Sequence, residues 1–191
     1  NQSGGVITGF DGILTSGGAT VVNAGSIGGT TAVSFGSGAA NRLVVDSGAV
    51  FSGIVDGGNT IGAASISTLE LASNASAGTL SSLGSNVIDF ARISIESGAY
   101  WALSGSSTLS SGVTLTDSGT LGVAGTLTVA GSLAVNGTLL NHGLIVGDVP
   151  LGAGGYLSNA FYRTITGSGS ATVLGAAGAA NTVANAGLIQ G

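Results

Sequence analysis

Residues 119–143, GTLGVAGTLTVAGSLAVNGTLLNHG, carry the clearest structural signal in this chain. This stretch repeats a six-residue unit in which glycine is followed by Ser or Thr and then by leucine, and the glycines are Gly119, Gly125, Gly131, Gly137 and Gly143. In the first three units a valine follows the leucine two residues later, which places both side chains on one face of an extended strand. The unit therefore predicts a short β-strand. We expect its glycine to supply the positive φ or tight bend that leads into the next strand.

Looser repeats extend over the rest of the chain. VDSGAVF at 45–51 is matched by IESGAYW at 95–101, and DSGT at 117–120 is a third version. Each version predicts a strand, an acidic turn and a second strand. No window combines a 3.6-residue apolar period with helix caps, so we expect no helix.

A longer repeat relates the two ends of the sequence. Residues 7–9 (ITG) and 20–27 (TVVNAGSI) recur as 165–167 (ITG) and 182–189 (TVANAGLI). The second copy carries four more residues between its two parts. We expect this super-repeat to restart at about residue 164.

Among all-β folds built from short strands, the period favours a solenoid. A sandwich needs longer strands with more widely spaced hairpin turns, whereas consecutive six-residue units are typical of the stacked coils of a parallel β-helix. With about 20 residues per coil we expect nine or ten coils and a rod about 45 Å long. Strict hexads also occur in left-handed helices, but the irregular remainder favours the right-handed type.

The whole chain, 1–191, is predicted to be a single β-solenoid segment. Within it we expect a hexad-repeat portion at 119–148 and an irregular loop excursion at about 147–163. The excursion surrounds Pro150, the only proline.

Composition excludes several classes of protein. Glycine supplies 37 of 191 residues and charged residues only 6%, unlike an ordinary globular enzyme, while 43% apolar residues are too many for a disordered chain. A net charge of −5 offers nucleic acid and anionic lipid little to bind, so we expect no nucleic-acid partner. No apolar run is long enough for a membrane span, so we expect no direct membrane insertion of this segment. Cysteine is absent, which excludes disulfides and thiolate chemistry.

The titratable residues do not form a recognisable catalytic or metal-binding motif. Polysaccharide lyases need clustered acids for Ca²⁺ and a base, but acidic residues occur singly here. Spacings near 20 residues, such as that between Glu70 and Asp89, could stack acids on adjacent coils, but solvated turn acids are the favoured interpretation. His142 with Asp148 lacks the sequence context of a nucleophile and has no second histidine for a metal. The sequence predicts no catalytic residue, metal or cofactor.

Aromatic residues are the candidate surface contacts. Tyr100 and Trp101 are neighbours on a strand, so one should point inward and the other outward. Whichever faces solvent, together with Tyr156 and Tyr162, is predicted to contact a glycan or a surface. The residues expected inside the rod, stacked between coils, are Phe35, Phe51, Phe90 or Trp101.

Four segments together carry a resemblance to a known family. Residues 20–27 (TVVNAGSI), 41–53 (NRLVVDSGAVFSG), 68–72 (TLELA) and 119–124 (GTLGVA) resemble the repeat regions of bacterial autotransporter passengers and large secreted haemagglutinin-like adhesins. The resemblance implies a right-handed β-helix displayed on, or released from, a Gram-negative cell surface. It also implies a processed or excised portion, whose attachment to the outer membrane is made by a part not present in this sequence.

The function expected from this resemblance is that of a non-enzymatic extracellular adhesin or biofilm segment, a stiff rod for adhesion or autoaggregation. Expected partners are other copies, associating laterally or end to end, and a glycan or a host or abiotic surface. An alternative is a filament subunit that assembles through open β-helix ends, because unpaired strand edges promote addition. A third hypothesis is a polysaccharide-cleaving enzyme.

Overall fold

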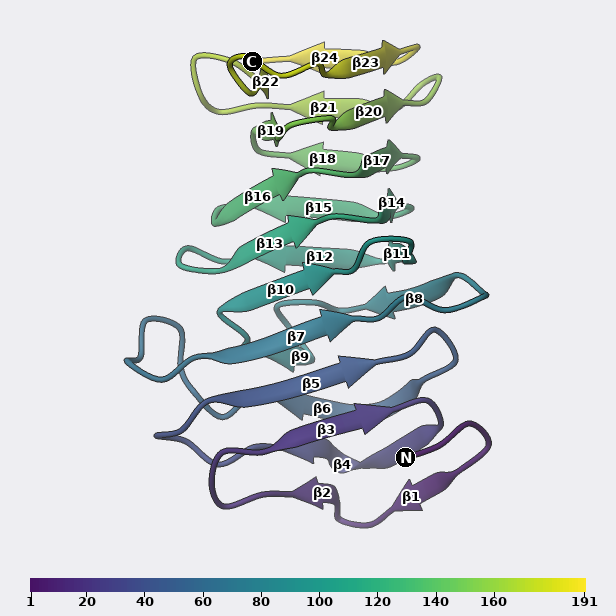
Figure 1. Cartoon of the computed structure of the whole chain (residues 1–191), viewed down its shortest axis with the longest axis vertical. Helices are drawn as coiled ribbons and strands as arrows, with labels where there is room; N and C mark the ends of the chain where they lie inside the picture. Colours follow the sequence, from purple (N-terminus) through teal and green to yellow (C-terminus); the bar gives the residue numbers. More distant parts are fainter.

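A computed structural model describes residues 1–191 as an all-β solenoid of about eight turns (Figure 1). All strand pairs between turns are parallel, and the chain contains no helix. The prediction of a parallel β-helix is confirmed. The strands form three sides of the rod, and the N-terminal turns differ from the rest.

One side, here the front sheet, has eight strands in an uninterrupted ladder. These strands are β3 (Thr20–Asn23), β5 (Asn41–Val45), β7 (Ser67–Leu71), β10 (Arg92–Ile95), β13 (Thr114–Asp117), β16 (Ser132–Val135), β19 (Val149–Leu151) and β22 (Val173–Gly175).

The chain passes from the front sheet to the side sheet and then to the back sheet. The side sheet contains β8 (Gly78–Ser81), β11 (Tyr100–Ser104), β14 (Thr120–Val123), β17 (Thr138–Asn141), β20 (Tyr156–Asn159) and β23 (Thr182–Asn185). The back sheet contains β12 (Ser106–Leu109), β15 (Thr126–Val129), β18 (Leu144–Val146), β21 (Thr164–Thr166) and β24 (Leu188–Gln190).

In the first turns, one N-terminal sheet covers both the side and the back. Its strands are β1 (Val6–Thr8), β2 (Asp11–Leu14), β4 (Ser26–Ser34), β6 (Val50–Asp56) and β9 (Val87–Ile88). The first part of β4 pairs with β1 and its last part with β2, and register shifts between Gly28 and Val33 mark the corner between the two parts.

One hexad forms one side of the rod, and three hexads form one turn. Leu115 pairs with Leu133, Leu121 with Leu139, and Leu127 with Ile145, so each side advances by three hexads per turn here. Other turns are longer, such as the one between the paired Leu157 and Val183. These insertions reduce the number of turns to about eight, fewer than the nine or ten expected.

The hexad glycines are required by close approach of the backbone, not by positive φ. None of the five has a φ in the left-handed region, so the expectation of a positive φ is wrong, whereas each glycine lies at a bend between two strands, as the alternative of a tight bend predicted. A Cβ on Gly125 would overlap the carbonyl oxygen of Gly105, and a Cβ on Gly143 would overlap that of Gly125. Only glycine allows the corners of successive turns to stack this closely.

The expected loop excursion at about 147–163 is instead a turn of the rod. It contains β19, which pairs with β16, and β20, which pairs with β17. Pro150 lies within β19, where its register partner is Leu174. The super-repeat does not match the turns either, because ITG at 7–9 begins in β1 of the N-terminal sheet whereas ITG at 165–167 begins in β21 of the back sheet.

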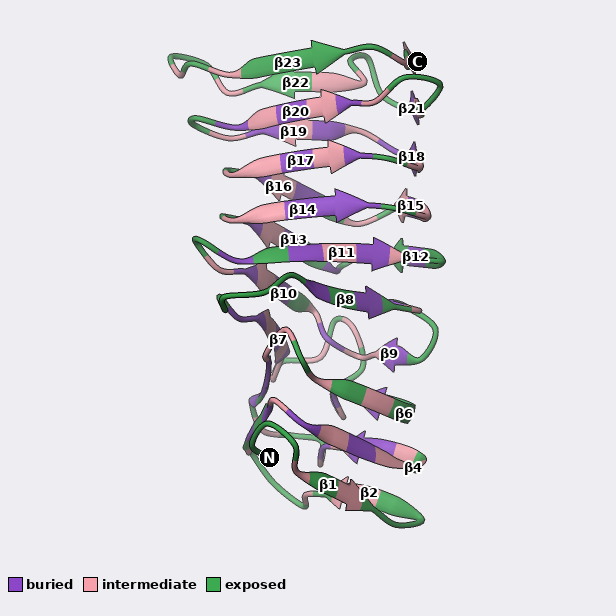
Figure 2. Ribbon diagram, turned by 90° about the vertical axis from the view of Figure 1, so that its right-hand side faces the viewer, coloured by how far each residue is buried: buried purple, intermediate pink, exposed green.

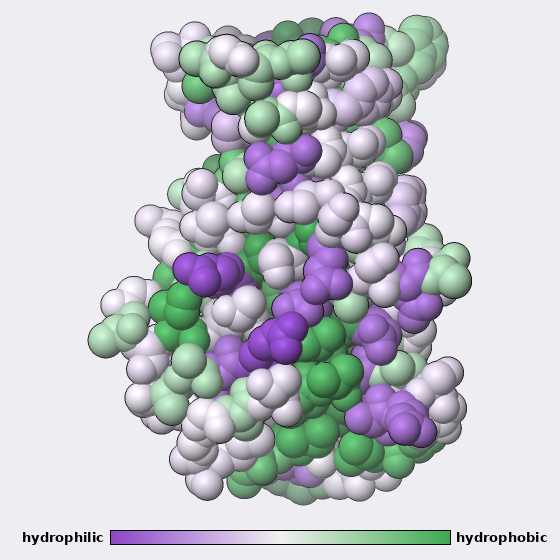
Figure 3. Space-filling view, in the orientation of Figure 1, coloured by the Kyte–Doolittle hydropathy of each residue, from purple (hydrophilic) through white to green (hydrophobic).

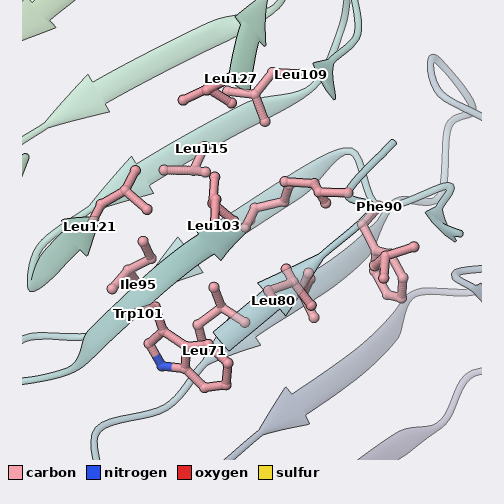
Figure 4. Close-up of a cluster of buried hydrophobic side chains, with 14 of the residues drawn as sticks. Leu71, Leu80, Phe90, Ile95, Trp101, Leu103, Leu109, Leu115, Leu121 and Leu127 are labelled. Atoms are coloured by element: carbon pink, nitrogen blue, oxygen red, sulfur yellow. The ribbon is translucent and has the colours of Figure 1, made fainter. Parts of the chain in front are cut away.

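The core is a set of apolar columns along the axis. Leu121, Leu127 and Leu139 are fully buried, and Figure 4 shows Leu103, Leu115 and other side chains pointing into the same interior. Phe35 and Phe90 pack edge to face with ring centroids 6.5 Å apart, as expected for inward aromatics.

Candidate functional site

The outer face of the side sheet is built from six strands in register. Its outward column, here the tyrosine–threonine column, places in register Tyr100, Thr120, Thr138, Tyr156 and Thr182. Figure 2 shows β11, β14, β17 and β20 stacked on this face, and exposed or half-buried residues alternate with buried ones in β11, β17 and β20. Tyr100 and Tyr156 are three rungs apart, about 14 Å at the usual strand spacing.

Alternation along β11 separates the two adjacent aromatic residues. Trp101 is 1% exposed and its indole N–H donates to the carbonyl of Ala72 at 3.0 Å. Trp101 pairs with Gly78, where a Cβ would lie 2.6 Å from the indole ring, so the glycine leaves room for the tryptophan. Trp101 is therefore a core residue and not a surface contact, whereas Tyr100 is 38% exposed on the outer face.

The other two predicted tyrosines lie in different surroundings. Tyr156 is half-buried in β20, within the tyrosine–threonine column. Tyr162 is 85% exposed at the corner between β20 and β21, with φ at 61°, and its ring packs on that of Phe161 with centroids 3.9 Å apart. The structure thus brings Tyr100 and Tyr156 into one column and leaves Tyr162 outside it.

Charge is unevenly distributed among the three sides. No strand of the side or back sheet contains a charged residue. The front sheet carries Arg92 and an ion pair in which Arg42 Nη2 lies 2.6 Å from Glu70 Oε2. Figure 3 views this front face and shows hydrophilic side chains in its middle part, with an apolar area below them.

Most acidic side chains hold turns or ion pairs. Asp148 accepts hydrogen bonds from the backbone N–H groups of Ser168 and Gly169 at 2.9 and 3.1 Å. Glu70 pairs with Arg42 and does not meet Asp89. No hydrogen bond joins His142 to Asp148, and no group of three acidic or histidine residues has the geometry of a metal site.

Two carboxyl groups that are separate in the sequence do come near each other. Burial, and then the charge of Asp56, raise the pKa of Asp89 above its usual value. Asp56 Oδ1 accepts the N–H of Gly58 at 2.7 Å. Asp56 therefore stabilises a turn next to β6.

Asp117 is the one acid inside the rod. Its Oδ1 accepts the N–H of Gly119 at 3.0 Å, while its Oδ2 has no partner. Burial raises the pKa of Asp117 to about 7. At a later corner of the rod, Asn141 makes the same bond to Gly143 and also donates to Asn159 Oδ1 at 2.8 Å. An uncharged side chain therefore suits this type of corner better.

No family model, curated protein or solved structure matches this chain. The fold includes no helix with the length and apolarity of a membrane span. Sequence reasoning missed that Tyr100 and Tyr156 share a column. Finding this requires the lengths of the three intervening turns, which only the strand register provides.

Proposed function

We propose that this chain is a segment of a non-enzymatic extracellular adhesin or biofilm protein, in which the solenoid is a stiff rod for adhesion or autoaggregation. The observation that carries the proposal is the uncharged outer face of the side sheet, with Tyr100 and Tyr156 aligned in one column. Two threonines between them offer hydroxyl groups at the strand spacing. Tyrosine combines an apolar ring with a polar hydroxyl, which suits contact with a glycan or with a like surface.

The absence of charge also supports lateral self-association on the side and back sheets. Two such faces meet without like-charge repulsion and without the desolvation of ions. We further propose a right-handed coil. In Figure 1 the front strands run from left to right and the back strands return behind them while the chain climbs from the N-terminus, which supports this hand.

The test compares aggregation by cells or beads that display the chain. Tyr100→Ala with Tyr156→Ala should strongly reduce aggregation, because both rings leave the column. A matched control, Thr114→Ala with Thr116→Ala, changes two outward residues of the front sheet and should leave aggregation unchanged. Full aggregation by the tyrosine variant would contradict the proposal.

An alternative function is end-to-end assembly into a filament. It is favoured by Val183 in the last side strand, which is 47% exposed although its partner in the turn below, Leu157, is fully buried. Negative-stain electron microscopy tests it. Filaments with an axial repeat of about 40 Å, eight rungs at the strand spacing, would support assembly through the ends. Laterally bundled short rods would support the first proposal instead.

A further inference from the structure

The ladder on the side of the rod is interrupted between β6 and β8. The residues Val50–Ser52 of β6 pair with β4 on one edge, and β8 pairs with β11 on one edge. No pairing joins β6 to β8. Figure 2 shows β8 set apart from β6 on the face where the later side strands are closely stacked. Two strand edges therefore face each other without a partner.

The back of the rod contains one rung more than the side at this level. On the back, β9 pairs with the last part of β6, Leu83 bridges to Val87 of β9, and Thr108 of β12 donates to the carbonyl of Leu83 at 2.8 Å. On the side, only β8 lies between β6 and β11. The side thus has one rung fewer than the back, and two strand edges that flank the position of one further strand lie about 10 Å apart.

A cleft of about 410 Å³ occupies this position, within the usual range of ligand pockets. Its lining includes the apolar side chains of Phe51, Leu80 and Val87 and the polar ones of Thr79 and Asn86, and no charged residue. Phe51 is half-buried, whereas its register partner Ile27 in the turn below is 1% exposed. The missing strand therefore leaves part of the core column open.

Backbone groups on both edges point into the cleft. The N–H of Val50 donates to the carbonyl of Gly25 at 2.9 Å, on the side of β4. Because consecutive residues of a strand direct their backbone groups to opposite edges, the N–H and C=O of Phe51 point away from β4 and into the cleft. In the side sheet, outward residues direct their N–H toward the preceding turn, as Thr120 does to Ala99 at 2.8 Å. Thr79 is such an outward residue, so its N–H and C=O face β6.

We propose that this cleft binds an extended, uncharged polypeptide strand with apolar side chains at alternate positions, which completes the side sheet by β-augmentation. An extended polypeptide presents N–H and C=O groups to both edges, as the two open edges require. Its inward side chains would cover Phe51 and Leu80, and the uncharged lining excludes a charged segment, whose desolvation nothing in the cleft offsets. This inference does not depend on the adhesion proposal.

The experiment uses the full chain and a fluorescent peptide, GTLTVAG, which copies residues 125–131. Binding is measured by fluorescence anisotropy. Thr79→Pro removes an N–H that faces the cleft and makes no native bond, and proline is tolerated at such an edge. It should weaken binding about 10-fold, the effect of one lost hydrogen bond. The matched control, Thr79→Val, keeps the N–H and should bind as the parent does.

If circular dichroism shows that Thr79→Pro does not fold, two peptide controls test the apolar contacts and the backbone hydrogen bonds instead. GTETEAG, in which both apolar residues are glutamate, should not bind. A GTLTVAG peptide methylated at alternate backbone nitrogens should lose binding as well. Absence of GTLTVAG binding at millimolar concentration, or equal binding by the methylated peptide or by folded Thr79→Pro, would overturn the proposal.

Discussion

The turns built from residues 92–166 and those built from residues 26–88 use the same kind of strand but stack differently. In the later turns, successive strands of all three sides pair in continuous ladders, and most turns advance by three hexads or slightly more. In the earlier turns the step between paired strands varies more, and it is much longer between Val55 and Val87 than between Val21 and Leu43. The earlier turns contain the extra rung on the back and the open cleft on the side.

Closure of the rod therefore depends on the repeat length. When three hexads follow one another, each adds one strand to one side of the rod. Every side then gains one strand per turn, so no strand edge is left unpaired. The segment 82–86 interrupts this rule, because it folds back so that Leu83 stacks on Val87. A locally inserted loop thus opens one side of the sheet without breaking the front ladder.

In the regular region, which is formed by the turns of residues 92–166, the largest loss of stability is expected from one added carbon at a hexad glycine. Gly125→Ala places a Cβ on the carbonyl oxygen of Gly105, where the clash is with backbone and not with a movable side chain. We expect a loss of about 4 kcal/mol or more, at the severe end of single substitutions. Urea unfolding followed by circular dichroism measures it.

Gly122→Ala is the matched control in the same turn. The atoms nearest to a Cβ there are the Tyr100 hydroxyl at 3.4 Å and the Cα and Cβ of Ala102 at 3.8 Å, which is ordinary van der Waals contact. The unfolding free energy should change by less than about 0.5 kcal/mol. Equal effects of the two substitutions would show that stacking of the corners is not what requires Gly125.

A double-mutant cycle tests the boundary between the two regions, where Trp101 packs over Gly78. Gly78→Ala should cost about 2 kcal/mol through overpacking, and Trp101→Leu about 3 kcal/mol through the cavity it leaves. Because the smaller leucine side chain makes room for the added methyl group, the double variant should lose less than the sum. Strict additivity of the two losses would contradict this packing.

The smallest of these effects is a pH dependence located in the regular region. The folded pKa of Asp117 is raised to about 7 from 3.8, so the folded state holds this proton more tightly than the unfolded state. Stability should therefore be greatest below about pH 4 and fall as the pH rises to about 7. Asp117→Asn should remove this pH-dependent contribution. At pH 8 it should raise the free energy of unfolding by about 2 kcal/mol, which is less than the free energy that corresponds to the full pKa shift.

Thermal unfolding of both proteins from pH 4 to 8 measures this effect. The parent chain should lose stability across that interval relative to Asp117→Asn. Parallel pH profiles for the two proteins would contradict the assignment to Asp117.

The sequence was sufficient for the hexad portion, but not for residues 147–163, where a loop was expected and the structure has β19 and β20. The hexad pattern identified the buried positions, since Leu121, Leu127, Leu133 and Leu139 are all at most 1% exposed. It did not identify the extra rung at Leu83, because residues 82–88 carry no hexad and their position depends on a bridge within a folded-back loop. Nor did it decide between Tyr100 and Trp101, because both fit an alternating strand and the space above Gly78 became known only from the register.

The side of the rod is closed in the turns of residues 92–166 and open between β6 and β8. Residue-resolved hydrogen exchange tests this difference through two amides of one outward column, Thr79 and Ala102. The Thr79 amide should exchange at least about 100-fold faster than that of Ala102, which is paired within the ladder. Equal protection of the two amides would mean that the side sheet is continuous and would contradict the account.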